Sequence, residues 1–180
     1  MPISINGSGT VTGISVGGLP DGIVDTDMLA AKAATAPKLG NGTIIQHKYV
    51  EMTDSSFTMN STTATDVPQL TNTISLTSAS NNTRITVSVT PYMGGTGNGR
   101  YSLTILRDST EIYDENHVIY RSGAFKAQRN HHTILDTGVS DTSSHTYKVQ
   151  VERLEGSDGF YLFGNSGKSK QVLILEEITA

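Results

Sequence analysis

Two adjacent histidines, His131 and His132, are the most conspicuous titratable pair in this sequence. Neighbouring side chains on a strand point to opposite faces, so one chain cannot direct both imidazoles at one ion. We therefore expect one exposed and one half-buried histidine and no metal site. A ring of equivalent histidines on an oligomer axis, holding a metal ion or an anion, is the alternative. His47, His117 and His145 show no ligand spacing.

Carboxylates could also do chemistry, because a glycosidase needs a paired acid and base. The candidate pairs lie in turn-forming stretches where aspartate is a common turn residue, which is the role we expect: Asp108 with Glu111, and Asp136 with Asp141. The glycine-rich run 94–99 lacks the Gly-Lys-Ser/Thr ending of a phosphate-binding loop. The sequence therefore predicts a protein that is not an enzyme and holds no cofactor.

Aromatic residues in two long connections are the better candidates for ligand contact. Tyr92 lies in the first connection, 91–100, and Tyr120 and Phe125 lie in the second, 115–130. Exposed aromatic rings on loops can stack on sugars or become buried at subunit contacts. We expect these three residues to contact a ligand or receptor. The aromatic residues inside expected strands should instead pack in the core: Tyr101, Phe160 and Phe163.

Alternation of apolar and polar residues predicts that the chain from Thr43 onward is all-β. Strands of this length at roughly ten-residue spacing favour a two-layer antiparallel β-sandwich of jelly-roll type, with an open barrel as the alternative. Residues 172–175 are apolar on both faces, which is typical of a strand in the middle of a sheet or at a subunit contact. The expected strands are 44–52, 57–60, 71–76, 84–89, 101–107, 111–114, 132–136, 146–154, 159–163 and 172–176.

The first 42 residues differ from the rest, with eight of the 18 glycines and five charged residues. Short period-2 stretches broken by glycine predict an extended arm, followed by a short helix over 28–34. Such a strip cannot bury its own apolar side chains, so we expect residues 1–42 to be an attachment arm and residues 43–180 to be the sandwich. The candidate attachment residues are Ile3, Ile5, Val11, Ile14 and Val16.

A weak ten-residue repeat pairs residues 23–30 with residues 33–40. A unit this short cannot bury its own apolar positions, so the repeat suggests parallel self-association around an axis. An alanine-rich linker is the alternative.

Composition excludes several classes of partner. The chain of 180 residues has 13 basic and 17 acidic residues, a net charge of −4, so nucleic acid is a poor ligand. No apolar run approaches the ~18 residues of a membrane span, and the N-terminus lacks the basic flank of a signal peptide. The absence of cysteine excludes disulfides, cysteine-ligated metal centres and a thiol nucleophile. We expect a soluble protein assembled in a reducing cytoplasm.

Several stretches resemble virion appendage proteins of tailed phages that infect marine bacteria and cyanobacteria. Residues 9–24 are similar to the start of those proteins, and residues 36–39 are similar to their short shaft units. The sandwich resembles their terminal domain at 63–76, 103–113 and 144–150. This chain has almost no shaft, which favours a short knob or a capsid decoration over a long reaching fibre.

The resemblance implies a homotrimeric β-sandwich knob in the virion, joined through residues 1–24 to a tail, baseplate or major capsid protein. We expect a short tail fibre whose loops around Tyr92 and Tyr120 contact host surface glycan, with three-fold symmetry multiplying weak contacts. A capsid decoration or head-fibre protein bound to the major capsid protein is the main alternative. A cellular carbohydrate-binding module and a glycan-cleaving enzyme are alternatives of other classes.

Overall fold

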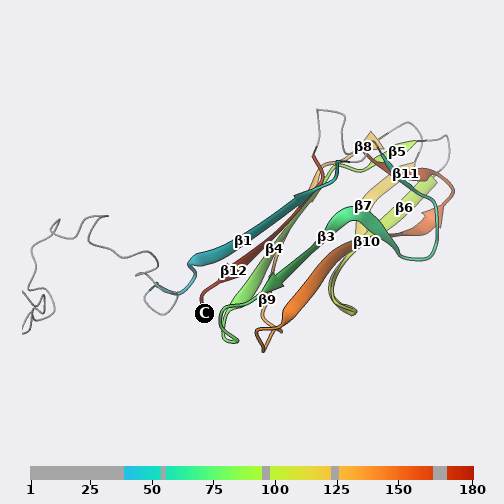
Figure 1. The fold of residues 1–180 in the computed structure, drawn as a ribbon. Coiled ribbons are helices and arrows are strands. Elements are labelled where there is room, and N and C mark those ends of the chain that lie inside the picture. The colour runs from blue at the N-terminus through green and yellow to red at the C-terminus, as the bar shows by residue number, and fades with distance from the viewer. Residues whose placement is uncertain (1–38, 54–55, 95–97, 123–125, 164–169) are drawn as a thin grey trace, which may run out of the picture. The chain divides into compact units, whose positions relative to one another are not determined.

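The structure, a computed structural model, describes residues 39–53, 56–94, 98–122, 126–163 and 170–180 (Figure 1). The expected arm and short helix, with Ile3, Ile5, Val11, Ile14 and Val16, lie outside the described residues. Residues 39–180 form one compact unit. The described part of that unit contains strands and no helix, and therefore no helix that could cross a membrane.

The described part of this unit contains twelve strands, and each of the ten expected strands is among them. The two additional strands, β5 and β8, fall in stretches that we expected to be long loops. These stretches are rich in glycine or in mixed polar residues, which do not indicate strands. The strands are β1 (Ile44–Glu51), β2 (Phe57–Met59), β3 (Thr65–Ser75), β4 (Asn82–Val89), β5 (Tyr92–Gly94), β6 (Asn98–Arg107), β7 (Thr110–Ser122), β8 (Lys126–Ala127), β9 (Asn130–Asp136), β10 (Ser144–Gly156), β11 (Gly159–Leu162) and β12 (Val172–Ile178).

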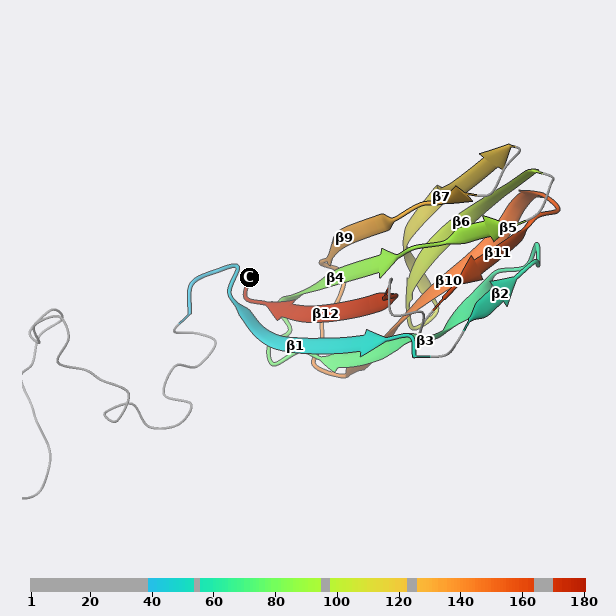
Figure 2. The same cartoon turned by 90° about the horizontal axis from the view of Figure 1, so that it is seen from above.

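The strands form three four-stranded antiparallel sheets. Sheet 1 has the order β1-β12-β4-β9, sheet 2 the order β3-β10-β6-β7, and the extension sheet the order β2-β11-β5-β8. The extension sheet continues sheet 1, because each of its strands directly precedes or follows the matching strand of sheet 1 in the chain. Sheet 1 and sheet 2 form two layers (Figure 2).

Counting each continued strand once leaves eight strands in chain order, arranged 1-8-3-6 in one layer and 2-7-4-5 in the other. This is the connectivity of a jelly roll, so the expected antiparallel β-sandwich is confirmed. The turn expected at Asp108 is also present, between β6 and β7. Asp108 has φ of 54° there, a left-handed conformation that aspartate tolerates better than most residues.

The core lies between the layers and follows the expected alternation. Val87 of β4, Val149 of β10 and Leu173 of β12 are fully buried. β12 lies between β1 and β4, so the expectation that this apolar strand is in the middle of a sheet is confirmed. Burying a leucine or valine side chain contributes about 1.5–3 kcal/mol, so these inward rows supply most of the stability.

A buried ion pair links the two layers. Arg107 of β6 donates from Nη1 to both carboxylate oxygens of Asp136, at 2.7 and 2.6 Å. Asp136 ends β9, and its carboxylate also accepts hydrogen bonds from the Tyr147 hydroxyl at 2.8 Å and the Gly138 amide at 2.9 Å. The Asp136 side chain is only 5% exposed. Its role is therefore more than the turn formation expected from the sequence, because it joins sheet 1 to sheet 2.

Removing that carboxylate should destabilise the fold strongly. We expect Asp136→Ala to lower the free energy of unfolding by about 3–5 kcal/mol, because it leaves the Arg107 guanidinium and the Tyr147 hydroxyl without their acceptor. Asp66→Ala is the matched control, since Asp66 pairs with Lys148 at 3.0 Å but is 51% exposed, and it should cost less than about 1 kcal/mol. Denaturant unfolding measures both; equal losses would contradict this role for Asp136.

Candidate functional site

Three aromatic side chains gather on the outer face of the extension sheet. Tyr92 of β5 lies opposite Tyr161 of β11, and Phe163 directly follows β11. The Tyr92 ring centroid lies 6.2 Å from that of Tyr161 and 5.9 Å from that of Phe163, with the planes tilted by about 60°. The rings of Tyr161 and Phe163 are nearly parallel, at 8°, with centroids 6.3 Å apart. We call these three residues the aromatic cluster.

Strand alternation explains why the cluster faces outward. Met93, Phe160 and Leu162 alternate with the cluster residues and are fully buried. The Tyr101 ring lies 5.1 Å from the ring of Phe160, and its hydroxyl donates to the Asp158 carbonyl at 2.6 Å. Tyr101 and Phe160 therefore pack in the core, as expected. Phe163 does not, because its position in the alternation places it beside Tyr161, where it is only half-buried.

Glycines occupy the strand positions next to the cluster. Gly159 of β11 lies opposite Gly94 of β5, next to the Tyr161 and Tyr92 pair. A Cβ at Gly159 would lie 2.9 Å from the Tyr161 hydroxyl oxygen, so glycine allows this ring to lean over its own strand. Parallel rings in face-to-face contact lie about 3.5–4 Å apart, so centroids separated by 6.3 Å leave part of each ring uncovered by the other.

The cluster has the chemistry of a stacking surface. Aromatic rings present an apolar, electron-rich face, and tyrosine adds a hydroxyl that can donate or accept a hydrogen bond. This combination suits ligands that are apolar on one side and hydroxylated at the edge, such as sugar rings. Sequence reasoning selected Tyr92 but missed Tyr161 and Phe163. The alternation of Tyr161 and Phe163 with Phe160 and Leu162 was the signal that could have identified them.

The structure does not bring Tyr92 and Tyr120 together. Tyr120 lies in β7, opposite Arg100 of β6, and is 48% exposed on the outer face of sheet 2. The expectation that both tyrosines occupy long loops was wrong, because β6 and β7 pair along most of this stretch and β5 pairs with β11. Phe125 lies outside the described residues. Contact of these residues with a ligand stays a prediction.

The paired histidines occupy the places expected. His131 is exposed and lies opposite Ser88, whereas His132 is half-buried and lies opposite the core residue Val87. Burial lowers the pKa of His132, and the Tyr113 hydroxyl lies 3.1 Å from its Nδ1. Within the ranges that the structure describes, no group of three or more histidine and carboxylate side chains is arranged to hold a metal ion.

A second histidine site was not expected. His145, at the start of β10, has Nδ1 2.8 Å from Asp108 Oδ2 and Nε2 3.1 Å from Asp141 Oδ1. Asp108 and His145 are 37 residues apart in sequence, so only the β6–β10 pairing could reveal this contact. The hydrogen bond to Asp108 raises the pKa of His145, even though partial burial opposes the shift. Hydrogen bonds from Ser143 lower the pKa of Asp141 to about 2.

This cluster contains the residue types of a hydrolase triad but not its chemistry. Ser143 Oγ lies 3.4 Å from His145 Nε2, and its hydroxyl donates to Asp141 instead. A catalytic histidine must accept the serine proton. His145 has a carboxylate at each ring nitrogen, which favours the doubly protonated imidazolium, a form with no lone pair to accept that proton. The cluster is therefore suited to tying the β6–β7 turn to β10.

Comparison with known proteins does not assign this chain to a family. No family model matches the chain, and the search of curated proteins found no match. The search of solved structures found the crystal structure of dimeric latent PorU from Porphyromonas gingivalis, with 11% identity and a TM-score of 0.46. The match covers 81% of this chain and only 14% of that chain. A likeness at this level carries no information about function.

The His145 cluster should make stability depend on pH. Because the pKa of His145 is higher in the folded state, its protonation stabilises the fold most below about pH 6.5, the pKa of histidine in the unfolded state. This stabilisation is lost as the pH rises through the folded-state pKa. We expect His145→Gln to lower the free energy of unfolding by about 1 kcal/mol at pH 5.5 and by less at pH 9. Urea unfolding at both pH values measures this.

His131→Gln is the control, because His131 is an exposed histidine outside the cluster. Its effect should be small at both pH values. His132 is present in the wild type and in His145→Gln, so its lowered pKa, which acts in the opposite direction, contributes to both. A His145→Gln effect that grows with pH would contradict the assigned cluster.

Proposed function

We propose that this chain is a structural virion protein of a tailed phage, a homotrimeric short tail fibre that binds host surface glycan and has no enzymatic activity. Its N-terminal arm joins it to another virion protein of the tail or baseplate. The observation that carries the proposal is an end-to-end arrangement of the sandwich. The chain enters the sandwich at one end, and the aromatic cluster lies at the other.

Hydrogen bonds fix the entry end. The Gly42 amide donates to the Thr179 carbonyl at 2.8 Å, and the Thr179 amide donates to the Thr43 carbonyl at 3.0 Å. The Thr179 hydroxyl also donates to the Gly40 carbonyl at 2.8 Å. From this end β1 runs toward β2 and the extension sheet, which forms the far end of the sandwich (Figure 1). In a chain attached to a particle through residues before Leu39, the aromatic cluster would lie at the end of the sandwich away from the attachment.

Binding without catalysis fits the remaining chemistry. The His145 cluster lacks a general base, and the aromatic cluster offers stacking rather than a reactive group. Stacking contacts of this size are weak singly, and three copies on one particle raise the effective affinity through multivalency. The jelly roll itself occurs in viral capsid and lectin domains, which is support by analogy of fold alone.

The second candidate is a capsid decoration or head-fibre protein bound to the major capsid protein. The near absence of a shaft favours it over a long fibre that reaches for a receptor. A cellular carbohydrate-binding module would use the same aromatic cluster but would need no attachment arm.

Gold-labelled antibody on purified phage particles separates these candidates. Label confined to the tail is the expected result, and label over the capsid would replace the tail fibre with the decoration protein. Absence of label from particles would contradict a virion role. A variant lacking residues 1–24 should still fold and assemble but should no longer join particles; failure of the truncated chain to fold would contradict an arm that serves attachment alone.

Glycan binding should depend on the aromatic cluster. We expect Tyr161→Ala to weaken binding of the full chain to purified host surface polysaccharide by about tenfold or more, because it removes one of the three rings of the cluster. Tyr120→Ala removes the other predicted contact, an exposed tyrosine of the other layer, and should weaken binding less than Tyr161→Ala does. Surface plasmon resonance compares them. Equal affinities for both variants and the wild type would rule out the cluster as the glycan site.

A further inference from the structure

We propose that the outer face of sheet 1 is the surface through which copies of this chain associate, around an axis that runs along its strands. The inference rests on the oligomer in the proposed function and assigns its interface. It starts from the six apolar side chains that this face presents among its polar ones, although the outer face of an antiparallel sandwich is normally polar.

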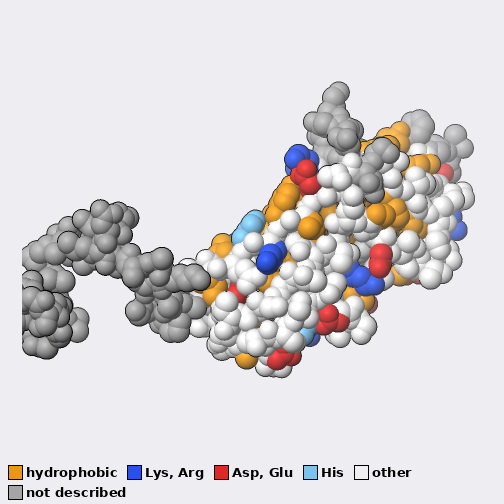
Figure 3. All heavy atoms as spheres, in the orientation of Figure 1, with side chains coloured by type: hydrophobic (Ala, Val, Ile, Leu, Met, Phe, Trp, Pro, Cys, Tyr) orange, Lys and Arg blue, Asp and Glu red, His pale blue; other side chains and the backbone are white. Residues whose placement is uncertain are grey.

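Strand register defines the residues of the face. Tyr49 of β1 lies opposite Ile174 of β12, and Ile44 lies opposite Ile178. Ile44, Tyr49 and Leu135 are 44%, 47% and 51% exposed. Hydrophobic side chains reach the surface along β1 in Figure 3. We call the following set the apolar face: Ile44, Tyr49, Leu135, Val172, Ile174 and Ile178.

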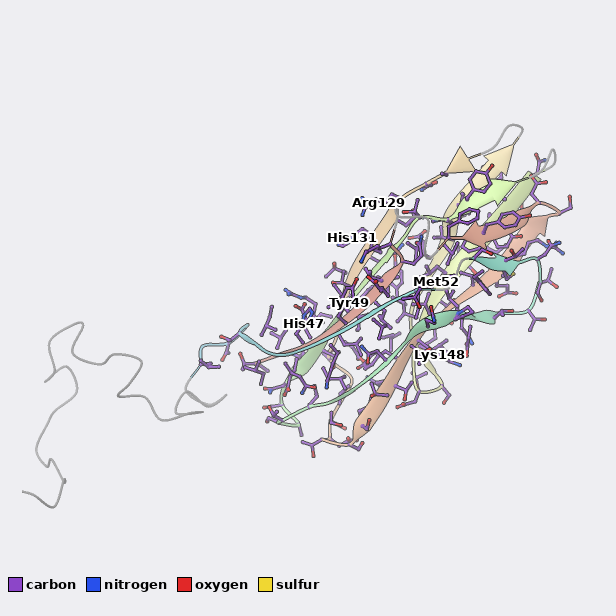
Figure 4. The ribbon with its side chains drawn as sticks, turned by 45° about the horizontal axis from the view of Figure 1, so that its top comes forward. His47, Tyr49, Met52, Arg129, His131 and Lys148 are labelled. Carbon is purple, nitrogen blue, oxygen red and sulfur yellow. The ribbon has the colours of Figure 1, made fainter. Side chains whose placement is uncertain are left out.

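The outer face of sheet 2 shows the ordinary pattern. Lys148 and Gln150 of β10 both bind the carboxylate of Asp66, at 3.0 and 2.6 Å. Thr104 of β6 donates to Asp114 of β7 at 3.2 Å. Figure 4 shows His47 and Tyr49 on β1, and Lys148 on the other layer. The outer face of sheet 1 therefore carries more apolar side chains than that of sheet 2, grouped on both sides of the Arg84–Glu176 pair, and exposed apolar surface of this kind marks an interaction site.

Charges on and beside the apolar face favour a second copy over a charged polymer. Arg84 lies 2.7 Å from Glu176, and Lys170 lies 2.7 Å from Glu51. Two cations and two carboxylates cancel, so the same face on another copy meets no net repulsion. A polyanion such as nucleic acid would gain nothing from a surface whose cations are already paired.

The position of the chain entry sets the axis. Leu39 joins the sandwich only five residues before Ile44, and 38 residues precede it. Copies that present this face to an axis along the strands would send all their N-terminal segments out at the same end, close to that axis. Because the extension sheet continues sheet 1, their aromatic clusters would gather around the same axis at the far end. A two-fold axis across the strands would send the segments in opposite directions.

Single-cysteine labelling tests the face directly, because the chain contains no cysteine of its own. Tyr49→Cys and Tyr120→Cys are matched variants, since the two tyrosines are 47% and 48% exposed on opposite layers. We expect the full-length chain to sediment as an oligomer. In that oligomer the Tyr49→Cys thiol should react with a charged maleimide at least about tenfold more slowly than the Tyr120→Cys thiol.

A charge variant tests the same face by assembly. Tyr49→Lys with Leu135→Lys should dissociate the full-length chain to its monomer of 19.2 kDa, whereas Tyr120→Lys should leave the oligomer intact. Circular dichroism and thermal melting establish that both variants remain folded. If the double variant does not fold, the labelling experiment still tests whether the apolar face is buried in the oligomer.

Several outcomes would overturn the inference: a monomeric wild-type chain, equal labelling of the two thiols in an oligomer, or an oligomer that survives the double substitution. Protection of the Tyr49→Cys thiol in a monomer would assign the face to residues 1–38 of the same chain instead. The proposed function fails separately, since an oligomer formed through this face on a protein that never labels phage particles would refute the virion role alone.

Discussion

The register of β12 is the constraint on which the rest of the structure depends. Glu177 of this strand is fully buried. Its carboxylate accepts hydrogen bonds from the Thr77 amide at 2.6 Å, the Thr77 hydroxyl at 2.8 Å, Asn81 Nδ2 at 2.7 Å and Gln46 Nε2 at 3.2 Å. A slip of β12 by one residue would withdraw these donors and exchange its two faces. A buried carboxylate without partners is costly, so Glu177 holds β12 in place.

That register determines both surfaces considered for function. With Leu173 and Leu175 turned into the core, Ile174 must face outward beside Tyr49, which creates the apolar face. The same layer continues into β11, where Phe160 is buried and Tyr161 faces outward. One side of the sandwich thus carries an apolar face near the chain entry and an aromatic cluster at the far end. The outer face of sheet 2 is polar and carries neither the apolar face nor the aromatic cluster.

Local patterns predicted the fold well, because alternation reports which residues of a strand are buried. The strands, the sandwich and the central place of β12 followed from it. Two of the missed contacts depend on pairing between distant segments. Tyr161 joins Tyr92 only through β5–β11 pairing, and His145 meets Asp108 only because β10 lies beside β6. Glycine-rich composition also concealed β5, so Tyr92 was assigned to a loop. The attachment residues of the arm lie outside the described residues and remain predictions.

The junction at Thr179 also has a mechanical consequence. A pull applied through the residues before Leu39 enters β1 along its own axis, next to the C-terminal end of β12. The hydrogen bonds of an antiparallel pair lie perpendicular to the strands, so this load shears the whole β1–β12 ladder at once instead of unzipping it bond by bond. Shear distributes force over every bond, whereas peeling concentrates it on one. The sandwich therefore resists a pull along β1 more strongly than a pull across the sheet.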